Sequence, residues 1–311
     1  MTAAPYPFLA PNPPVCPEGL LAKARSATAP RVALVNAGAV HPMNGLREAV
    51  EAGLAQPILI GDEAKIASTA EEIGWDISGI PTIHAPKDTA APMAAQMARE
   101  GQADAIMKGQ LHTSTFLKGL LPSAAGLRAP GARCGHIFHI TAPGHDRPLL
   151  MTDGALNVNP DVTTRKACLT LAVELAQKLG VERPKAGLLA PSEDPTPGVP
   201  NTYEAAEIAE WAKTALPQAA VQGPMAMDLI LSRAAADTKG YEGEVPGDAD
   251  IIVTPNITTG NALFKMMSFG MGCCCAGIVL GAKVPIILTS RAQAAEDRLA
   301  SAALAVIGAR G

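Results

Sequence analysis

The residues best suited to chemistry lie close together near the C-terminus, where a hydroxyl, a guanidinium and a carboxylate follow an apolar segment. Ser290 and Arg291 come directly after the apolar segment 285–289, and Asp297 lies a short distance further on. An arginine offers a planar fork of donors for phosphate oxygens, and a hydroxyl can donate to an oxygen that becomes negative during a reaction. A nearby carboxylate can accept a proton. Together these groups are suited to acyl or phosphoryl transfer on an anionic substrate.

Each of these residues also has a purely structural interpretation. Ser290, with Gln293 three residues later, has the pattern of a helix capping box. An isolated arginine such as Arg291 is typical of a surface ion pair. Asp297 is favourably placed against the dipole of the helix predicted at 294–307. Spacing alone therefore leaves both interpretations open.

The rest of the chain must position these side chains. Short β-branched segments alternate with alanine-rich helical ones, a pattern that predicts parallel strands joined by right-handed crossovers. We expect strands at residues 31–36, 57–60, 82–85, 105–108, 136–141, 149–152, 186–190, 220–223, 251–254, 277–280 and 285–289. The clearest helices are expected at 163–179, 203–216 and 294–307. Ligands of such sheets collect beyond the carboxyl ends of strands, which is where Ser290 and Arg291 fall.

Two connecting segments and one strand carry signals of their own. The Gly/Pro/His-rich stretch 142–148 is either a hairpin or a hinge between two lobes. Asn201 followed by Glu204 predicts a capping box at the start of the next helix. His136 and His139 lie three residues apart in a predicted strand and so point to opposite faces, which argues against a shared metal ion.

The composition excludes several classes of protein. The chain has 311 residues, a net charge of −4 and only 3% aromatic residues, so we expect no nucleic-acid partner. We expect no membrane either, since no apolar run reaches the ~18 to 20 residues of a spanning helix. The proline-rich start has no signal-peptide pattern, and we expect a cytoplasmic protein. The six cysteines, including the run 273–275, lack the spacing of zinc or redox sites and are expected to be buried, reduced thiols.

Several common motifs are missing from the sequence. It contains no P-loop, no Gly-x-Ser-x-Gly nucleophile elbow and no His-Glu-x-x-His zinc helix. The segment 270–275 comes nearest to a dinucleotide fingerprint, but Cys275 stands in place of its third glycine. The sequence thus gives no support for an enzyme built on one of these motifs.

Several segments, occurring in order, resemble the phosphate acetyltransferase and phosphate butyryltransferase family. They are Met107-Lys108-Gly109 with His112-Thr113, the run from Thr152 to Asp161, Gly223 to Asp228, Gly247 to Asp250, Gly260-Asn261 with Lys265, Gly277 to Ala282, and Ile287 to Arg291. Several ordered matches are more specific than any one of them alone.

This resemblance implies an α/β fold of two α/β lobes with mainly parallel sheets and an active-site cleft between them, as in isocitrate and isopropylmalate dehydrogenases. It places residues 1–142 and 286–311 in a first, discontinuous lobe and residues 143–285 in a second. The implied reaction is the reversible transfer of a short acyl group, acetyl to butyryl, between coenzyme A and inorganic phosphate, giving acyl phosphate. Coenzyme A would be a co-substrate, with no metal and no tightly bound cofactor, and the enzyme would be a homodimer.

The resemblance also implies roles for individual residues. Ser290 matches a serine that hydrogen-bonds the reacting carbonyl oxygen, Arg291 an arginine that holds the phosphate, and Asp297 a proposed base for the thiol of coenzyme A. A base is needed because a thiol with a pKa near ~8.5 is only a few per cent thiolate at neutral pH. The implied substrate-binding residues are His112, Thr113, Lys118, Arg133, Asp153, Asn157, Asp228, Asn261 and Lys265.

One position departs from the family, and other functions stay open. Lys118 stands where the acetyltransferases carry an arginine, so a bidentate fork is lost there, and Arg128 or Arg133 would have to supply it. The acyl-chain length is left open.

Two alternative functions also stay open. They are an NAD- and metal-dependent dehydrogenase of related two-lobed fold, and a non-catalytic protein that binds coenzyme A or acyl phosphate.

Overall fold

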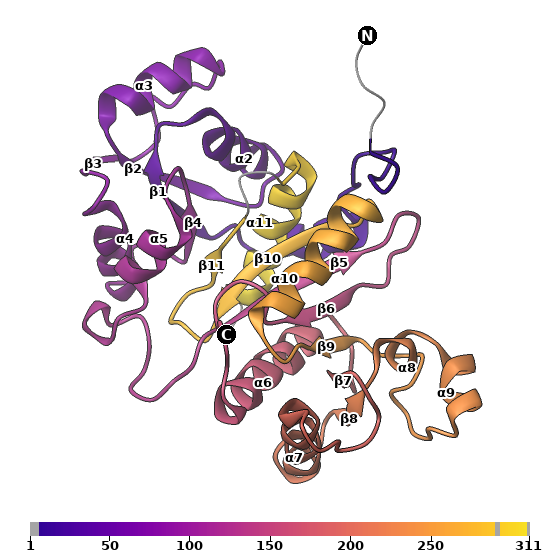
Figure 1. Ribbon diagram of the computed structural model, residues 1–311. Helices are drawn as coiled ribbons and strands as arrows, with labels where there is room; N and C mark the ends of the chain where they lie inside the picture. The colour runs from indigo at the N-terminus through magenta and orange to yellow at the C-terminus, as the bar shows by residue number, and fades with distance from the viewer. Residues whose placement is uncertain (1–5, 290–292, 310–311) are drawn as a thin grey trace. The chain divides into compact units, whose positions relative to one another are not determined.

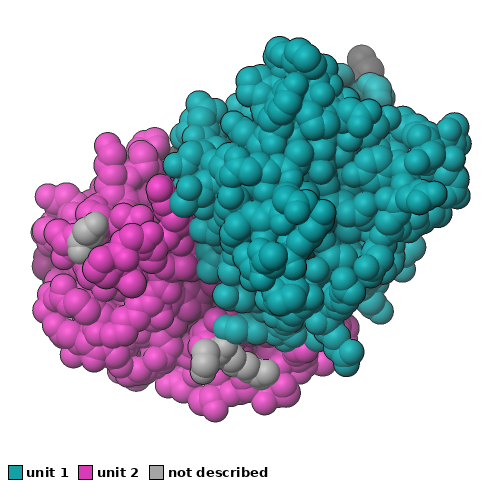
Figure 2. Space-filling view, turned by 90° about the horizontal axis from the view of Figure 1, so that it is seen from below, with its two compact units in different colours: residues 1–13, 135–275 teal, residues 14–134, 276–311 magenta. Residues whose placement is uncertain are grey.

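The computed structural model describes residues 6–289 and 293–309, which form the helices and strands labelled in Figure 1. The chain divides into two compact units, coloured separately in Figure 2. Unit 1 comprises residues 1–13 and 135–275, and unit 2 comprises residues 14–134 and 276–311.

These limits differ from the expected ones at 142/143 and 285/286, and hydrogen bonds explain the difference. Strand β5 (Gly135–Thr141) pairs along its length with β6 (Leu149–Thr152), so it stays in unit 1. Strand β10 (Cys274–Leu280) pairs with β11 (Ile286–Ile287), which draws residues 276–285 into unit 2. The N-terminal segment joins unit 1 because Ala10 N donates to the carbonyl oxygen of Phe269 at 2.7 Å.

Unit 2 contains a sheet in the order β3-β2-β1-β4-β11-β10. Its remaining strands are β1 (Arg31–Ala37), β2 (Gln56–Gly61), β3 (Thr82–His84) and β4 (Ala105–Lys108). Neighbouring strands are parallel except for β10 and β11. Consecutive residues of β1 and β4 are buried, which is typical of a parallel sheet covered on both faces.

Unit 2 also contains helices, one of which begins with a side-chain cap. They are α1 (Glu18–Arg25), α2 (Val40–Glu51), α3 (Glu63–Glu72), α4 (Ala90–Arg99), α5 (Thr113–Leu120) and α11 (Ala295–Ala309), with a 3₁₀ turn at Ser123–Ala125. Asp62 caps α3 by accepting the N–H of Lys65 at 3.2 Å. Helix α11 buries Ala302, Ala303 and Val306 on one side.

Unit 1 contains a sheet in the order β5-β6-β9-β7-β8. The further strands are β7 (Lys185–Leu189), β8 (Ala220–Met225) and β9 (Ile251–Val253). The helices are α6 (Val162–Lys178), α7 (Pro200–Ala215), α8 (Met227–Leu231), α9 (Arg233–Lys239) and α10 (Ile257–Lys265), and a π-helical turn, Met266–Gly270, follows α10. Strands β5 and β6 are antiparallel, and the other neighbours are parallel.

The predicted strands are all present, but two predictions about connections need correction. The β5–β6 and β10–β11 pairs are antiparallel because connections as short as 142–148 and 281–285 leave no room for a crossover helix. The segment 142–148 is therefore a hairpin. The capping box at Asn201 was wrong, because α7 already begins at Pro200, a residue that suits the first helical position.

The cysteines and histidines singled out in the sequence lie in the core. Five of the six cysteines are buried as thiols, and Cys273 and Cys275 pack in the apolar cluster of unit 1. His136 and His139 are both buried in β5. Across residues 6–289 and 293–309, no three His, Cys, Asp or Glu side chains come together as metal ligands. No helix in these same ranges is long and apolar enough to cross a lipid bilayer.

Candidate active site

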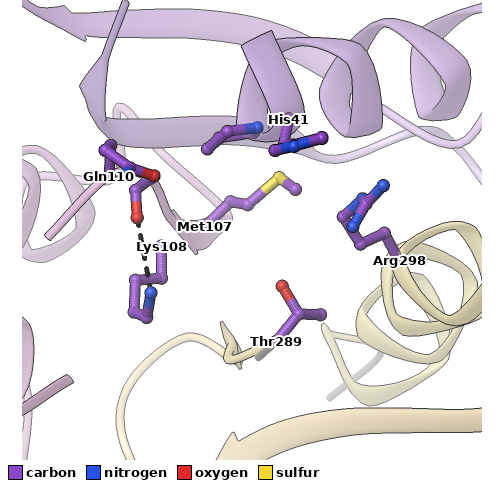
Figure 3. A pocket seen from close by; sticks show the side chains of 8 residues that line it. His41, Met107, Lys108, Gln110, Thr289 and Arg298 are labelled. Carbon is purple, nitrogen blue, oxygen red and sulfur yellow. Dashed lines mark hydrogen bonds between the residues drawn. The ribbon is translucent and has the colours of Figure 1, made fainter. Parts of the chain in front are cut away.

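A pocket in unit 2 lies at the carboxyl end of β4 (Figure 3). It is lined by His41, Pro42, Met107, Lys108, Gly109, Gln110, Thr289 and Arg298. Its volume is about 90 Å³. One water molecule needs only ~10 to 15 Å³ by this kind of measure, so the pocket has room for a larger chemical group.

Three neighbouring strands deliver these side chains to one place. Lys108 ends β4 and pairs with Val35 of β1, while Thr289 follows β11 on the other side of β4. His41 lies in the first turn of α2, the helix that follows β1. The carboxyl ends of adjacent parallel strands are where open α/β sheets bind ligands. The pocket therefore occupies the position that the strand order favours.

Gly109 allows the chain to leave β4 close against β1. Its N–H donates to the carbonyl oxygen of Val35 at 2.9 Å. A Cβ atom at this position would overlap the carbonyl oxygens of Val35 and Asn36. A side chain here would push the pocket loop away from β1.

The pocket is positively charged. Lys108 is only 7% exposed, and its ammonium donates to the carbonyl oxygen of Gly109 at 3.4 Å. Arg298 donates from Nη1 to the carbonyl oxygen of Gln293 at 2.6 Å, and its buried Nε has no acceptor within the part of the chain that the structure describes. None of the described lining residues is acidic. Two cations in the lining of one pocket suit an oxyanion.

Of the three predicted catalytic residues, Asp297 is described, whereas Ser290 and Arg291 lie outside the described residues, as does the capping box predicted from Ser290. Asp297 is buried in the first turn of α11, and its Oδ2 accepts the N–H of Ala294 at 3.2 Å. Its carbonyl oxygen accepts the hydroxyl of Ser301 at 2.6 Å. Asp297 thus holds the start of the helix that presents the next residue, Arg298, to the pocket.

The other predicted residues of unit 2 lie along α5 and the loop that follows it. His112 is the exposed N-cap residue of α5 and Thr113 is its first residue, so both come shortly after Gln110 of the pocket. Lys118 is exposed in the last turn of α5. Arg133 is exposed and lines a second small pocket with Arg128. His112, Thr113, Lys118 and Arg133 do not line the pocket at β4.

Three of the predicted residues in unit 1 come together around one loop. Asp153 is 4% exposed, and its carboxylate accepts the main-chain N–H groups of His136, Ala155 and Leu156 at 2.8 to 3.0 Å. The side-chain amide of Asn157 donates to the same carboxylate at 2.7 Å. The side-chain amide of Asn261 donates to the carbonyl oxygen of Gly154 at 3.2 Å. The carboxylate of Asp153 therefore organises the loop.

Lys265 and Asp228 have other partners. The ammonium of Lys265 lies 5.0 Å from the ring centre of Phe264 and 5.4 Å from that of Phe269. Asp228 is exposed and pairs with Lys239 at 3.0 Å, and the hydrogen bond from that lysine holds the pKa of Asp228 below its ordinary value. Both side chains are at the surface of helices, where a ligand can reach them.

Sequence reasoning did not single out four of the residues that line the pocket. Met107, Lys108 and Thr289 were noted only as parts of motifs, and Arg298 was overlooked beside Asp297. The usable signal was Lys108, a charged residue at the end of the otherwise apolar segment 105–108. No comparable signal marks Arg298, because arginines on helices are most often at the surface.

Comparison with known proteins decides the family. The sequence pattern of the family described as "Phosphate acetyl/butaryl transferase" matches residues 85–306, well over half of the chain. The chain belongs to this family. A phosphate acetyltransferase of Rhizobium meliloti is 37% identical over 297 residues, which cover 93% of this chain and 92% of the relative. The protein is accordingly a phosphate acyltransferase, and the suggested resemblance is confirmed.

Solved structures confirm the fold class. A branched-chain phosphotransacylase from Enterococcus faecalis superposes with a TM-score of 0.78 at 28% identity, covering 90% of this chain and 99% of that one. A 4-hydroxythreonine-4-phosphate dehydrogenase from Klebsiella pneumoniae superposes with a TM-score of 0.54 at 12% identity, covering 91% and 100%. The second likeness is one of fold alone, and it does not favour the dehydrogenase alternative.

Proposed function

We propose that the protein transfers a short acyl group, acetyl to butyryl, reversibly between coenzyme A and inorganic phosphate. One observation carries this proposal: the buried ammonium of Lys108 and the guanidinium of Arg298 line a single pocket at the ends of three adjacent strands. The pocket also includes Thr289, the residue directly before Ser290 and Arg291. An anion site at this position matches the phosphate that the reaction requires.

The reaction needs positive charge to hold the phosphate and a hydrogen-bond donor at the reacting carbonyl oxygen. A phosphate oxygen attacks the carbonyl carbon of the thioester, the new C–O bond forms, and the C–S bond breaks to release coenzyme A as a thiolate that takes up a proton. Negative charge builds on the carbonyl oxygen, and a donor fixed at that oxygen accelerates such reactions. Ser290 would be this donor and Arg291 would hold the phosphate, with Lys108 and Arg298 balancing its charge.

In the reverse direction the thiol of coenzyme A must lose its proton. Asp297 is proposed as the base from the family resemblance, and it lies buried in the first turn of α11, directly before Arg298 of the pocket. Asp297 does not itself line the described pocket, so the thiol would have to approach it past Arg298.

The remaining predicted residues are proposed to bind coenzyme A. His112, Thr113, Lys118 and Arg133 offer donors and positive charge for its phosphates, and the half-buried Lys265 offers a further ammonium group. Asp153, Asn157 and Asn261 would act through the loop that they organise, and Asp228 at the start of α8. We also propose a homodimer located in the cytoplasm. The family resemblance supports the dimer, and the buried thiols are in keeping with a reducing compartment.

The test is release of the coenzyme A thiol by the full-length protein. Acetyl-, propionyl- and butyryl-CoA are supplied with phosphate, with arsenate in its place, and with neither. We expect release only when an oxyanion is present. Release that ignores the oxyanion would overturn the proposal, as would binding of coenzyme A with no turnover, and reduction of a nicotinamide with magnesium would point to the dehydrogenase alternative.

Substitutions test the roles of the positively charged side chains. Arg291→Ala should lower kcat/KM by about 30- to 1,000-fold, which corresponds to ~2 to 4 kcal/mol of transition-state stabilisation. Arg298→Met keeps the aliphatic stem and should raise the KM for phosphate. The matched control is Lys213→Met, which removes an exposed cation from unit 1. Near-normal turnover by Arg291→Ala would show that this arginine has a structural role.

A further inference from the structure

We propose that Met107 sets the upper limit on the length of the acyl chain that the enzyme accepts. This inference rests on the proposed function, because it assigns the acyl group to the pocket at the end of β4. It concerns a side chain to which the reaction scheme above gives no role.

The lining of the pocket separates into a charged part and an apolar part. Lys108 and Arg298 supply the cations, and an acyl phosphate or thioester would turn its oxygens toward them. The hydrocarbon part of the substrate then needs an apolar wall. Figure 3 shows the thioether of Met107 reaching into the pocket below His41, across from Thr289 and Arg298. Met107 is the largest apolar side chain in the described lining.

The backbone of Met107 and the base of its side chain are fixed, which limits how far the side chain can move to admit a longer chain. Its backbone is held on both sides, by Leu34 of β1 and by Ile287 of β11. The residue is 1% exposed, so the base of its side chain is packed in the interior. Only its flexible end faces the pocket, and that end is the boundary that a growing acyl chain would meet.

The size of the pocket agrees with a short acyl group. Its volume is about 90 Å³. A dry cavity of ~150 Å³ holds a benzene molecule, so the present pocket, whose charged part faces the phosphate, leaves room for a chain of only a few carbons. Removing the Cγ, Sδ and Cε atoms of Met107 would open space for further carbons in line with the existing ones.

The experiment measures kcat/KM of wild type and Met107→Ala for straight-chain substrates from acetyl-CoA to hexanoyl-CoA, with saturating phosphate. Each methylene of the substrate that becomes buried should raise kcat/KM about fourfold. The ratio of kcat/KM for hexanoyl-CoA to that for butyryl-CoA should therefore rise about 15-fold in Met107→Ala, since two methylenes are added. The kcat/KM for acetyl-CoA should change much less than the kcat/KM for hexanoyl-CoA.

Two controls and one substitute variant separate pocket shape from general destabilisation. Met107→Leu keeps the volume and should keep the wild-type chain-length profile within about twofold. Met43→Ala removes the same atoms from a methionine that is fully buried in α2 and does not line the pocket, so it should lose stability without changing the profile. If Met107→Ala does not fold, Met107→Val replaces it and should give a smaller shift in the same direction.

Two failures can be told apart. If the wild type releases thiol in a phosphate-dependent manner but the Met107 variants keep its chain-length profile, the inference about Met107 is overturned and the proposed function stands. If the wild type shows no phosphate-dependent release with any acyl-CoA, the proposed function falls and the inference falls with it.

Discussion

Replacing Asp153 by asparagine tests whether this carboxylate organises the loop or acts on the substrate. The side chain is 4% exposed and accepts main-chain N–H groups on both oxygens, those of Ala155 and Leu156 on Oδ1 and that of His136 on Oδ2. The amide of Asn157 also donates to Oδ2. In Asp153→Asn an NH₂ group must replace one oxygen, so at least two donors lose their acceptor whichever way the amide turns.

The expected loss in free energy of unfolding follows from the number of donors left without an acceptor. A buried donor left without an acceptor costs about 1 to 3 kcal/mol, so two donors cost roughly 2 to 6 kcal/mol. For a domain of this size about 2 to 4 °C is lost per kcal/mol, and the melting temperature should fall by at least about 4 °C. Thermal denaturation followed by circular dichroism measures the change. Asp228→Asn, at an exposed ion pair, is the control and should melt close to the wild type.

The opposite result would refute this reasoning. If Asp153→Asn melts within about 1 °C of the wild type and nonetheless loses acyl transfer, the carboxylate acts on the substrate and its hydrogen bonds contribute little to the free energy of unfolding.

Two further predictions concern the pocket loop and acid stability. Gly109→Ala should abolish acyl transfer and lower the melting temperature, because the added Cβ overlaps the carbonyl oxygens of Val35 and Asn36; a normal thiol-release rate would contradict the proposed position of the pocket. Burial lowers the pKa of His139 from 6.5 to about 4, so the unfolded chain takes up a proton that the folded chain resists. The free energy of unfolding should fall by about 3 kcal/mol as the pH drops from 7 to 4, and His139→Phe, compared in urea titrations at both pH values, should lack this part of the loss.

The secondary structure was largely predictable because the strands of a covered parallel sheet are nearly continuous apolar segments. The segment 105–108 was predicted with the bounds that β4 has. The antiparallel pairing of β5 with β6 was harder to predict. An alternation of strands and helices favours parallel neighbours, and it does not show in which direction a strand runs after a short connection. The start of α7 was missed because Pro200 and Asn201 are both good helix starters.

The site was predictable in part. The order of the strands brings 105–108 and 285–289 side by side, and only this pairing places Lys108 and Thr289 in one pocket. A linear pattern does not contain that adjacency. Asp153 is the opposite case, since its motif stands out in the sequence while the structure shows that its oxygens are occupied by main-chain N–H groups.

Strand β10 has a consequence for how the protein is made. Its first residues, Cys274 and Cys275, belong to unit 1, and the rest of the strand belongs to unit 2. During translation, unit 1 therefore has its whole sequence once residue 275 has left the ribosome. At that stage unit 2 is still incomplete. Its strands β1 to β4 lack β11 and α11, which are synthesised last. A nascent chain stalled after residue 275 but before β11 would be vulnerable to proteolysis in unit 2, while unit 1 already has its whole sequence and can fold.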